Sequence, residues 1–183
     1  MTMTAAASCP TSVVNAPVET VWALLTRPEA WGEFYDLRVA SVTPPGLAVV
    51  GQIVLAESGP RLLRLKIEFR FTAVDAANHR LGFDVRFPFG VTVREDLNCV
   101  PFEAGRCRVN YRCDFGFPAG WRGGVVRFLT RREVYSGPAD SLSRLQRAAE
   151  QRYALGAGHH ISGAPLKGEH DVASGDHARR TPR

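Results

Sequence analysis

The sequence predicts an α+β fold in which a curved antiparallel sheet of about seven strands is covered by one long C-terminal helix. Two observations carry this prediction. The middle of the chain alternates apolar and polar residues with a period of two, and both ends have the period of a helix. A sheet with one apolar face must be covered, and the last helix is the only element long enough to do it.

A strand-then-helix unit comes first, in "VVNAPVETVWALLTRPEAW" from Val13 to Trp31. Its short apolar run stops at Asn15-Ala16-Pro17, and a helix-period segment follows at once. The stretch "PEAWGEFYD" predicts a second short helix with Pro28 in its first turn. We expect the strand to join the sheet, and the two helices to close one end of it, pinned by Trp22 and Trp31.

Regular alternation predicts three long strands, which run from Leu63 to Phe71, from Leu81 to Phe89 and from Cys107 to Phe117. Shorter candidates are Leu37–Val42, Val50–Ala56 and Val91–Cys99. Turn residues separate them in "TPPG", "ESGP", "DAANH" and "PFEAG". We therefore expect each strand to have one solvent-exposed face and one buried face.

Helical periodicity returns after Gly120 and gives two apolar stripes. The first is Trp121, Val125, Phe128 and Leu129, and the second is Leu142, Leu145 and Ala149. Ser136-Gly137-Pro138 lies between them and predicts a bend or break, because proline lacks an N–H and clashes with the preceding turn. We expect the first stripe to pack on the sheet at the mouth of a cavity. The Ser136-Gly137-Pro138 sequence then either lets the helical segment before it lift from the sheet, or is a static kink that follows the curvature of the sheet.

Residues 1–155 are expected to form one domain and residues 156–183 a flexible tail rich in Gly, Ser and charge. The tail holds metal-binding residue types without ligand-motif spacing, so no metal site is expected. These residues are His159, His160, His170, Asp171 and His177.

Composition excludes several classes of protein. The 183 residues are 45% hydrophobic and 22% charged, as in ordinary globular domains, and no apolar run approaches the roughly 20 residues of a membrane span. The start "MTMTAAASCP" lacks the features of a secretory signal, so a cytoplasmic location is expected. The four cysteines have no CxxC spacing and are expected to be buried thiols. A net charge of +5, scattered and without a recognition motif, gives no reason to expect nucleic-acid binding.

Motif searches exclude further chemistry. Every histidine except His79 lies in the tail, so no Ser-His-Asp or Cys-His set can be assembled. The sequence has neither a phosphate-binding GxxxxGK[ST] motif nor a dinucleotide fingerprint. We therefore expect no cofactor.

Glu95 is the most informative polar residue, because in "GVTVREDLNC" it falls in the apolar phase of the strand. A carboxylate on the covered face is costly unless it is paired, hydrogen-bonded or protonated, and burial raises its pKa toward that of a general acid or base. Tyr111 lies on the inward phase of its own strand, where its hydroxyl could orient a ligand oxygen. The alternatives are a bulge that turns Glu95 outward, an arginine partner for it, and a backbone hydrogen bond for Tyr111.

Three stretches of the sequence form a family signature: "VNAPVETVWALLTRPEAWGEF", "FPFG" followed by "VREDL", and "FGFPAGWRG" leading into "DSLSRLQRAAE". In these motifs the chain resembles the START-like helix-grip superfamily (SRPBCC), in its polyketide cyclase/dehydrase-like branch, over about residues 10–155. The resemblance implies a helix-grip fold with an apolar cavity between sheet and helix. Some members carry lipids or other hydrophobic molecules, and others cyclise or dehydrate polyketide chains.

The resemblance and the apolar phase together predict binding of a small hydrophobic molecule, such as a lipid, an isoprenoid or a polyketide-like compound. Tyr35 would lie at the cavity mouth, or be a surface or capping aromatic. The other expected lining residues are Phe69, Phe71, Phe83, Phe87, Val93, Cys113, Phe115, Val125, Phe128 and Leu129. The alternative for any one phenylalanine is ordinary core packing, which contributes about 2–3 kcal/mol when the side chain is fully buried.

Two further functions stay open at this stage. In a cyclase or dehydratase, Glu95 would be the acid–base group and Tyr111 the orienting group in the same cavity. In an interaction module, Arg127, Arg131 and Arg132 would dock an acidic partner, unless they form an ordinary solvated face. No stable membrane insertion is expected, and the sequence indicates no oligomeric state.

Overall fold

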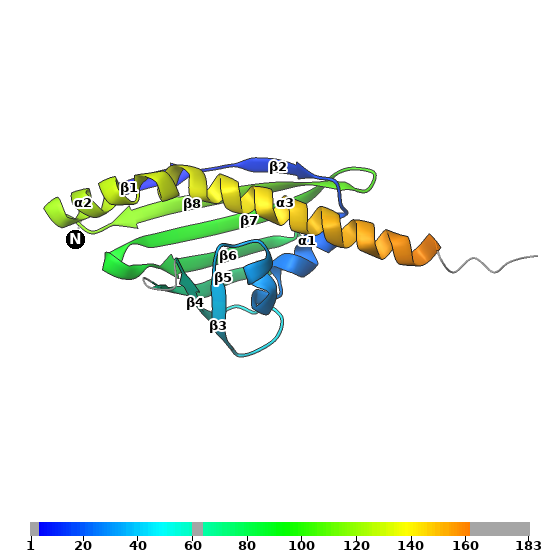
Figure 1. Ribbon diagram of the computed structural model, residues 1–183, viewed down its shortest axis with the longest axis horizontal. Coiled ribbons are helices and arrows are strands. Elements are labelled where there is room, and N and C mark those ends of the chain that lie inside the picture. The colour runs from blue at the N-terminus through cyan, green and yellow to red at the C-terminus, as the bar shows by residue number, and fades with distance from the viewer. Residues whose placement is uncertain (1–3, 60–63, 162–183) are drawn as a thin grey trace, which may run out of the picture.

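A computed structural model describes residues 4–59 and 64–161 of the chain. It has an eight-stranded antiparallel sheet in the order β1-β8-β7-β6-β5-β4-β3, with β2 also paired to β8. Figure 1 shows the sheet curving beneath one long helix, which runs along the molecule. The predicted α+β helix-grip fold is confirmed.

The strands are β1 (Thr4–Ser8), β2 (Thr11–Val14), β3 (Arg38–Thr43), β4 (Ile53–Ser58), β5 (Leu65–Asp75), β6 (Arg80–Arg86), β7 (Thr92–Glu103) and β8 (Arg106–Phe117). Seven of them correspond to predicted strands, although Leu63, at the start of one prediction, lies outside the described residues. β1 was not predicted, because "TAAAS" has neither alternation nor β-branched apolar residues.

Strands β1 and β2 share β8 as their partner. β1 pairs with its second half, from Ser8↔Cys113 onward, and β2 pairs with its first half, up to Thr11↔Asn110. Between them, the N–H of Tyr111 donates to the carbonyl of Pro10 at 3.0 Å. The backbone of β8 is thereby hydrogen-bonded to β2 before Tyr111 and to β1 after it.

The helical elements are α1 (Val18–Leu25), η1 (Pro28–Glu33), the short turn η2 (Pro88–Gly90), α2 (Trp121–Leu129) and α3 (Arg131–Ile161). A break in the helix occurs at Thr130, and α3 is unbroken through Pro138, so the bend-or-break prediction at Ser136-Gly137-Pro138 is wrong as to a break. α3 also continues past Gly156, where the sequence suggested its end. Residues 162–183 of the predicted tail lie outside the described residues, as do the side chains of His159 and His160.

The core lies between the concave face of the sheet and α3, which buries Leu142, Leu145 and Ala149. At the end covered by η1, Trp31 is fully buried, and its Nε1–H donates to the carbonyl of Leu25 at 3.0 Å. Its indole packs on three phenylalanines of the sheet, with ring centroids 5.3–5.5 Å away: Phe69, Phe71 and Phe83. The anchoring role predicted for Trp31 is confirmed.

One expected inward position, that of Phe89, is corrected at the opposite end of the sheet. β6 ends at Arg86, and in the following turn Phe89 has φ 63° and is exposed. Pro88 lacks an N–H and cannot continue the ladder, so the alternation read through "RFPFG" fails there. Phe87 remains partly buried against the core.

The face of α2 that meets the sheet is also not the expected one. The predicted stripe is exposed and consists of Trp121, Val125, Phe128 and Leu129. The buried residue of α2 is Gly123, and Val126 packs partly against the core. Gly123 faces inward because the helix passes so close to Pro118 that a Cβ there would lie 1.7 Å from its carbonyl oxygen. Glycine fits this contact and the apolar stripe does not.

Within the described parts of the chain, no helix is both long and apolar enough to cross a membrane.

Candidate functional site

Glu95 lies on the concave face of the sheet, as its phase predicts. It is paired with Phe83 on β6 and with Cys113 on β8, and the register is unbroken at both positions. Its side chain is only 7% exposed, whereas its neighbours Arg94 and Asp96 lie on the other face and form ion pairs with Asp84 and Arg80. Neither a bulge nor an ion pair with Glu95 is present among the described residues.

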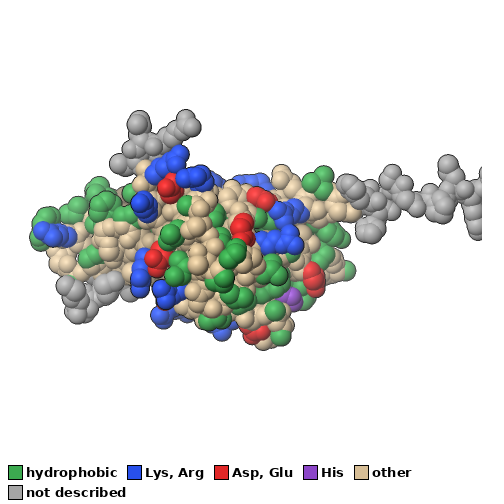
Figure 2. Space-filling view, turned by 90° about the horizontal axis from the view of Figure 1, so that it is seen from below, with side chains coloured by type: hydrophobic (Ala, Val, Ile, Leu, Met, Phe, Trp, Pro, Cys, Tyr) green, Lys and Arg blue, Asp and Glu red, His purple; other side chains and the backbone are tan. Residues whose placement is uncertain are grey.

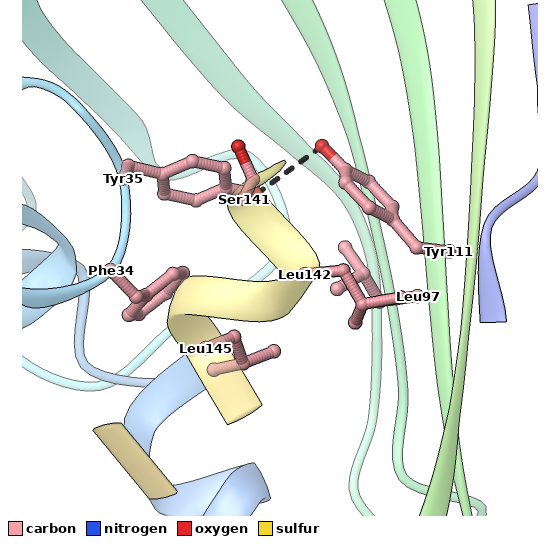
Figure 3. A pocket seen from close by; sticks show the side chains of 7 residues that line it. All are labelled: Phe34, Tyr35, Leu97, Tyr111, Ser141, Leu142 and Leu145. Atoms are coloured by element: carbon pink, nitrogen blue, oxygen red, sulfur yellow. Dashed lines mark hydrogen bonds between the residues drawn. The ribbon is translucent and has the colours of Figure 1, made fainter. Parts of the chain in front are cut away.

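Two tyrosine hydroxyls converge on this carboxyl group. Tyr111, which is buried, donates its hydroxyl to Oε2 of Glu95 and not to the backbone. The hydroxyl of Tyr35, which follows η1, lies 3.5 Å from that of Tyr111. Figure 3 shows these two hydroxyls facing each other across the space beside α3. Polar contacts therefore connect Glu95 on the sheet, through Tyr111, to Tyr35, which is only partly buried.

Burial sets the proton affinity of this group. It raises the pKa of Glu95 from 4.5 to about 7, and the hydrogen bonds from Tyr111 and Tyr35 oppose that rise. Burial and the neighbouring Glu95 charge both raise the pKa of Tyr111 and of Tyr35 well above the ordinary value. Near neutral pH the carboxyl group can thus exchange a proton while both phenols stay protonated.

A small pocket adjoins the two tyrosines, between the end of η1, the sheet and α3. It is lined by Phe34, Tyr35, Leu97, Tyr111, Ser141, Leu142 and Leu145. The empty space among them, including part that is open to solvent, is about 180 Å³, and it is too narrow to admit a water molecule. The pocket is therefore nearly closed by its own side chains.

Most residues predicted to line a cavity are buried on the same concave face, but they pack there as core. These are Phe69, Phe71, Phe83, Val93, Cys113 and Phe115. Of the site residues predicted from the sequence, only Tyr35 and Tyr111 line the pocket. The exposed Val125, Phe128 and Leu129 are turned away from the sheet, which corrects their predicted position.

Five pocket residues were not predicted as site residues: Phe34, Leu97, Ser141, Leu142 and Leu145. Leu97 shares the strand phase of Glu95, and Leu142 and Leu145 form the apolar stripe of the last helix, so patterns for these three were present in the sequence. Ser141 and Phe34 have no such pattern. Their place depends on how η1 and α3 pack on the sheet.

Cysteine and metal chemistry find no support here. Within the described ranges there is no cluster of His, Cys, Asp and Glu that could hold a metal ion. Cys113, beside Glu95, is a buried free thiol, and burial together with the Glu95 charge raises its pKa. A thiol with a raised pKa is a poor nucleophile near neutral pH.

Solved structures with the same fold include two enzymes. The ZhuI aromatase/cyclase from Streptomyces sp. R1128 is 17% identical, with a TM-score of 0.63 over 81% of this chain and 96% of that chain. A point mutant of norcoclaurine synthase from Thalictrum flavum, in complex with a transition-state analogue, is 13% identical, with a TM-score of 0.60 over 83% and 98%. The same synthase was also solved with dopamine and hydroxybenzaldehyde, and there the TM-score is 0.59 at 13% identity over 81% and 88%.

At these identities the similarity shows the fold alone. No curated protein matches the sequence significantly. A family model described as polyketide cyclase/dehydrase and lipid transport matches residues 9–150, which is most of the chain. The sequence motifs, the curved sheet around its helix and this match agree, and the chain belongs to the polyketide cyclase/dehydrase and lipid transport family of START-like helix-grip proteins.

Proposed function

We propose that this protein binds a small hydrophobic molecule between the sheet and α3, and that the group formed by Glu95, Tyr111 and Tyr35 recognises a hydroxyl or carbonyl on it. The observation that carries the proposal is this polar group in an otherwise apolar interior. Burying a carboxyl group without a cation costs stability, whereas an apolar side chain there would not. A binding role accounts for its presence.

The polar groups suit a ligand that is mostly apolar. The carboxyl group accepts hydrogen bonds when ionised and donates one when protonated, and each phenol can do both. The remaining pocket wall is largely apolar, from Phe34, Leu97, Leu142 and Leu145. Ligand sites commonly combine an apolar wall with a few polar groups in this way.

Binding requires the pocket to open, because its empty space does not admit even water. Its wall on one side is α3, and on the other it is Phe34 and Tyr35, which follow η1. We expect the ligand to replace contacts between these two elements while the sheet stays in place.

A second candidate function is acid–base catalysis at the same position, as in a cyclase or dehydratase. A carboxyl group with a pKa of about 7 can both remove and return a proton near neutral pH. Tyr111 would hold the carboxyl group in place, and Tyr35 would orient a substrate oxygen. This candidate needs the same bound ligand and adds only the proton transfer.

The binding test is a screen by native mass spectrometry and thermal shift against lipids, isoprenoids and aromatic polyketides. A bound ligand at about a hundred times its Kd stabilises the fold by about 2.7 kcal/mol, which a thermal shift detects. Tyr35→Phe should weaken binding, whereas Tyr153→Phe, on the exposed side of α3, should not. If nothing co-purifies and no compound binds, the proposal is wrong.

The catalytic candidate is tested with Glu95→Gln on any ligand that the screen finds to react. We expect this variant to keep binding and to lose turnover. In the wild type, turnover should depend on pH with a midpoint near 7. Full turnover by Glu95→Gln would exclude Glu95 as the acid–base group and leave binding alone.

A further inference from the structure

Helix α2 presents an apolar face to solvent. We call the residues that form it the α2 apolar face: Trp121, Val125, Phe128 and Leu129. Trp121, Phe128 and Leu129 are 76%, 73% and 73% exposed. Large apolar side chains grouped at one place on a surface mark an interaction site.

The orientation of α2 follows from its other side. With 3.6 residues per turn, Gly123, Val126 and Thr130 lie opposite the α2 apolar face. The first of these is buried and the second packs against the core. Gly123 lies in close contact with Pro118, and in this orientation of α2 its large apolar side chains are exposed.

Two exposed arginines lie on the rest of the α2 surface. By the same helical geometry, Arg122 lies at the border of the α2 apolar face beside Leu129, and Arg127 lies farther round the helix, beyond Gly124. Neither arginine forms an ion pair in the portion of the chain that the structure describes, and the sequence from Pro118 to Arg132 contains no Asp or Glu. The guanidinium of Arg122 lies 5.7 Å from the ring centre of Trp121.

A further exposed aromatic residue lies in the preceding turn η2. Phe89 is 74% exposed, and the adjoining Gly90 lies close to Pro118, just before α2. Figure 2 shows this end of the molecule at the left, where hydrophobic side chains surround a basic one. Trp, Phe and Leu on one face of a helix, with arginines on the rest of its surface, are typical of helices that lie in a membrane interface.

We infer that the α2 apolar face docks onto an anionic lipid surface, with its apolar side chains among the acyl chains and Arg122 and Arg127 on the headgroup phosphates. The charge of the arginines selects the occupant, because they complement an anionic surface and would be poorly paired against a neutral one. Trp121 suits the boundary, since its indole has an apolar body and an N–H for the headgroup layer. This docking does not depend on the proposed ligand or on Glu95.

Tryptophan fluorescence gives a direct readout. The chain has three tryptophans, of which Trp31 is buried, Trp22 is half-buried and Trp121 is exposed. With vesicles of phosphatidylcholine and phosphatidylglycerol we expect Trp121 emission to shift to the blue and to be quenched by brominated acyl chains. Trp121→Phe should abolish both changes while the protein still sediments with the vesicles.

Substitutions separate the apolar from the charged contribution. In co-sedimentation, Phe128→Ser should weaken partitioning about tenfold through loss of apolar burial. Arg122→Gln and Arg127→Gln should each weaken it about fivefold, with reduced sensitivity to salt. Val50→Ser is the matched control, because Val50 is 64% exposed in the β3–β4 connection and should leave partitioning unchanged.

Three results would overturn the inference. The first is no sedimentation with the anionic vesicles. The second is equal partitioning of Phe128→Ser and Val50→Ser. The third is a wild-type dimer that Phe128→Ser dissociates, since a second copy would then cover this face. All the substituted side chains are exposed, so circular dichroism should show an unchanged fold for each variant.

Discussion

At the scale of single residues, the main feature is a carboxyl group that the sheet register places in the core. Glu95 faces the core because it occupies the phase of Val93 and Leu97, while its charged neighbours pair on the outer face. Ionisation of Glu95 near neutral pH therefore opposes folding. This has a direct consequence for stability against pH.

Glu95→Gln should change the pH dependence of stability. The folded pKa of Glu95 is about 7 against 4.5 for an ordinary glutamate, so the folded state binds more protons between these values. The contribution of Glu95 to the free energy of unfolding is fully present below about pH 4.5 and is lost as the pH rises through about 7. Relative to Glu95→Gln, the free energy of unfolding of the wild type should fall by about 3 kcal/mol over that range.

Urea unfolding at pH 5 and at pH 8 checks this prediction. Glu57→Gln is a suitable control, because the pKa of Glu57 is lowered by its hydrogen bonds to Arg38 and Arg64 and it lies at the surface. A wild type whose stability relative to Glu95→Gln is the same at both pH values would contradict the burial argument.

Tyr111→Phe should destabilise the protein, and more so at high pH. Without the Tyr111 hydroxyl, the Glu95 carboxylate loses its hydrogen bond inside the core, which costs about 1–3 kcal/mol when it is ionised. Tyr35→Phe removes only a long hydroxyl contact of 3.5 Å and should cost less. Urea unfolding at pH 8 compares the two, and equal costs would mean that Tyr111 does not hold the carboxyl group.

Sequence alternation was sufficient to place Glu95 and Tyr111 on one face of the sheet, because a strand has a strict period of two. It could not place Tyr35, Ser141 or Leu142 around them. Those positions depend on where η1 and α3 cross the sheet, and a local pattern contains no information about that crossing. The pair Glu95 and Tyr111 on the sheet was thus predictable from alternation, whereas the position of the residues of η1 and α3 around this pair was not.

At the scale of elements, α2 shows how a helical stripe can be assigned to the wrong partner. The sequence stripe of α2 is apolar, and burial was the natural expectation. The contact of Gly123 with Pro118 decides otherwise, since it brings the helix backbone too close for any side chain. A glycine in a helix can thus mark the buried face when a neighbouring backbone needs the room.

Gly123→Ala and Gly124→Ala form a matched pair that tests this account. At Gly123 a Cβ would meet the carbonyl of Pro118 at 1.7 Å, so the backbone must shift at a cost of about 1–3 kcal/mol. At Gly124 nothing lies within 4 Å, and alanine should stabilise the helix by up to about 1 kcal/mol. Thermal unfolding measures both, and the same sign for the two substitutions would show that α2 does not pack on Gly123.

At the scale of the whole molecule, the sheet is closed at one edge by a strand without a sequence signature. β1 is a run of alanines between Thr4 and Ser8, and it covers the half of β8 that carries Cys113 and Phe115. β2 covers the other half and ends before α1, so the two strands together form the edge of the sheet opposite β3. Without β1, half of a long, apolar strand would be an open edge.

Deleting residues 1–8 should therefore weaken the fold and promote association. The deletion removes the pairing of β1 with Cys113–Phe117, and the loss of these hydrogen bonds and of apolar cover should lower the free energy of unfolding by about 2 kcal/mol or more. An open edge that alternates buried apolar residues also pairs readily with other chains. Urea unfolding and light scattering measure the two effects, with deletion of residues 1–3, which leaves β1 intact, as control. Unchanged stability and a monomeric shortened protein would mean that β2 alone closes this edge.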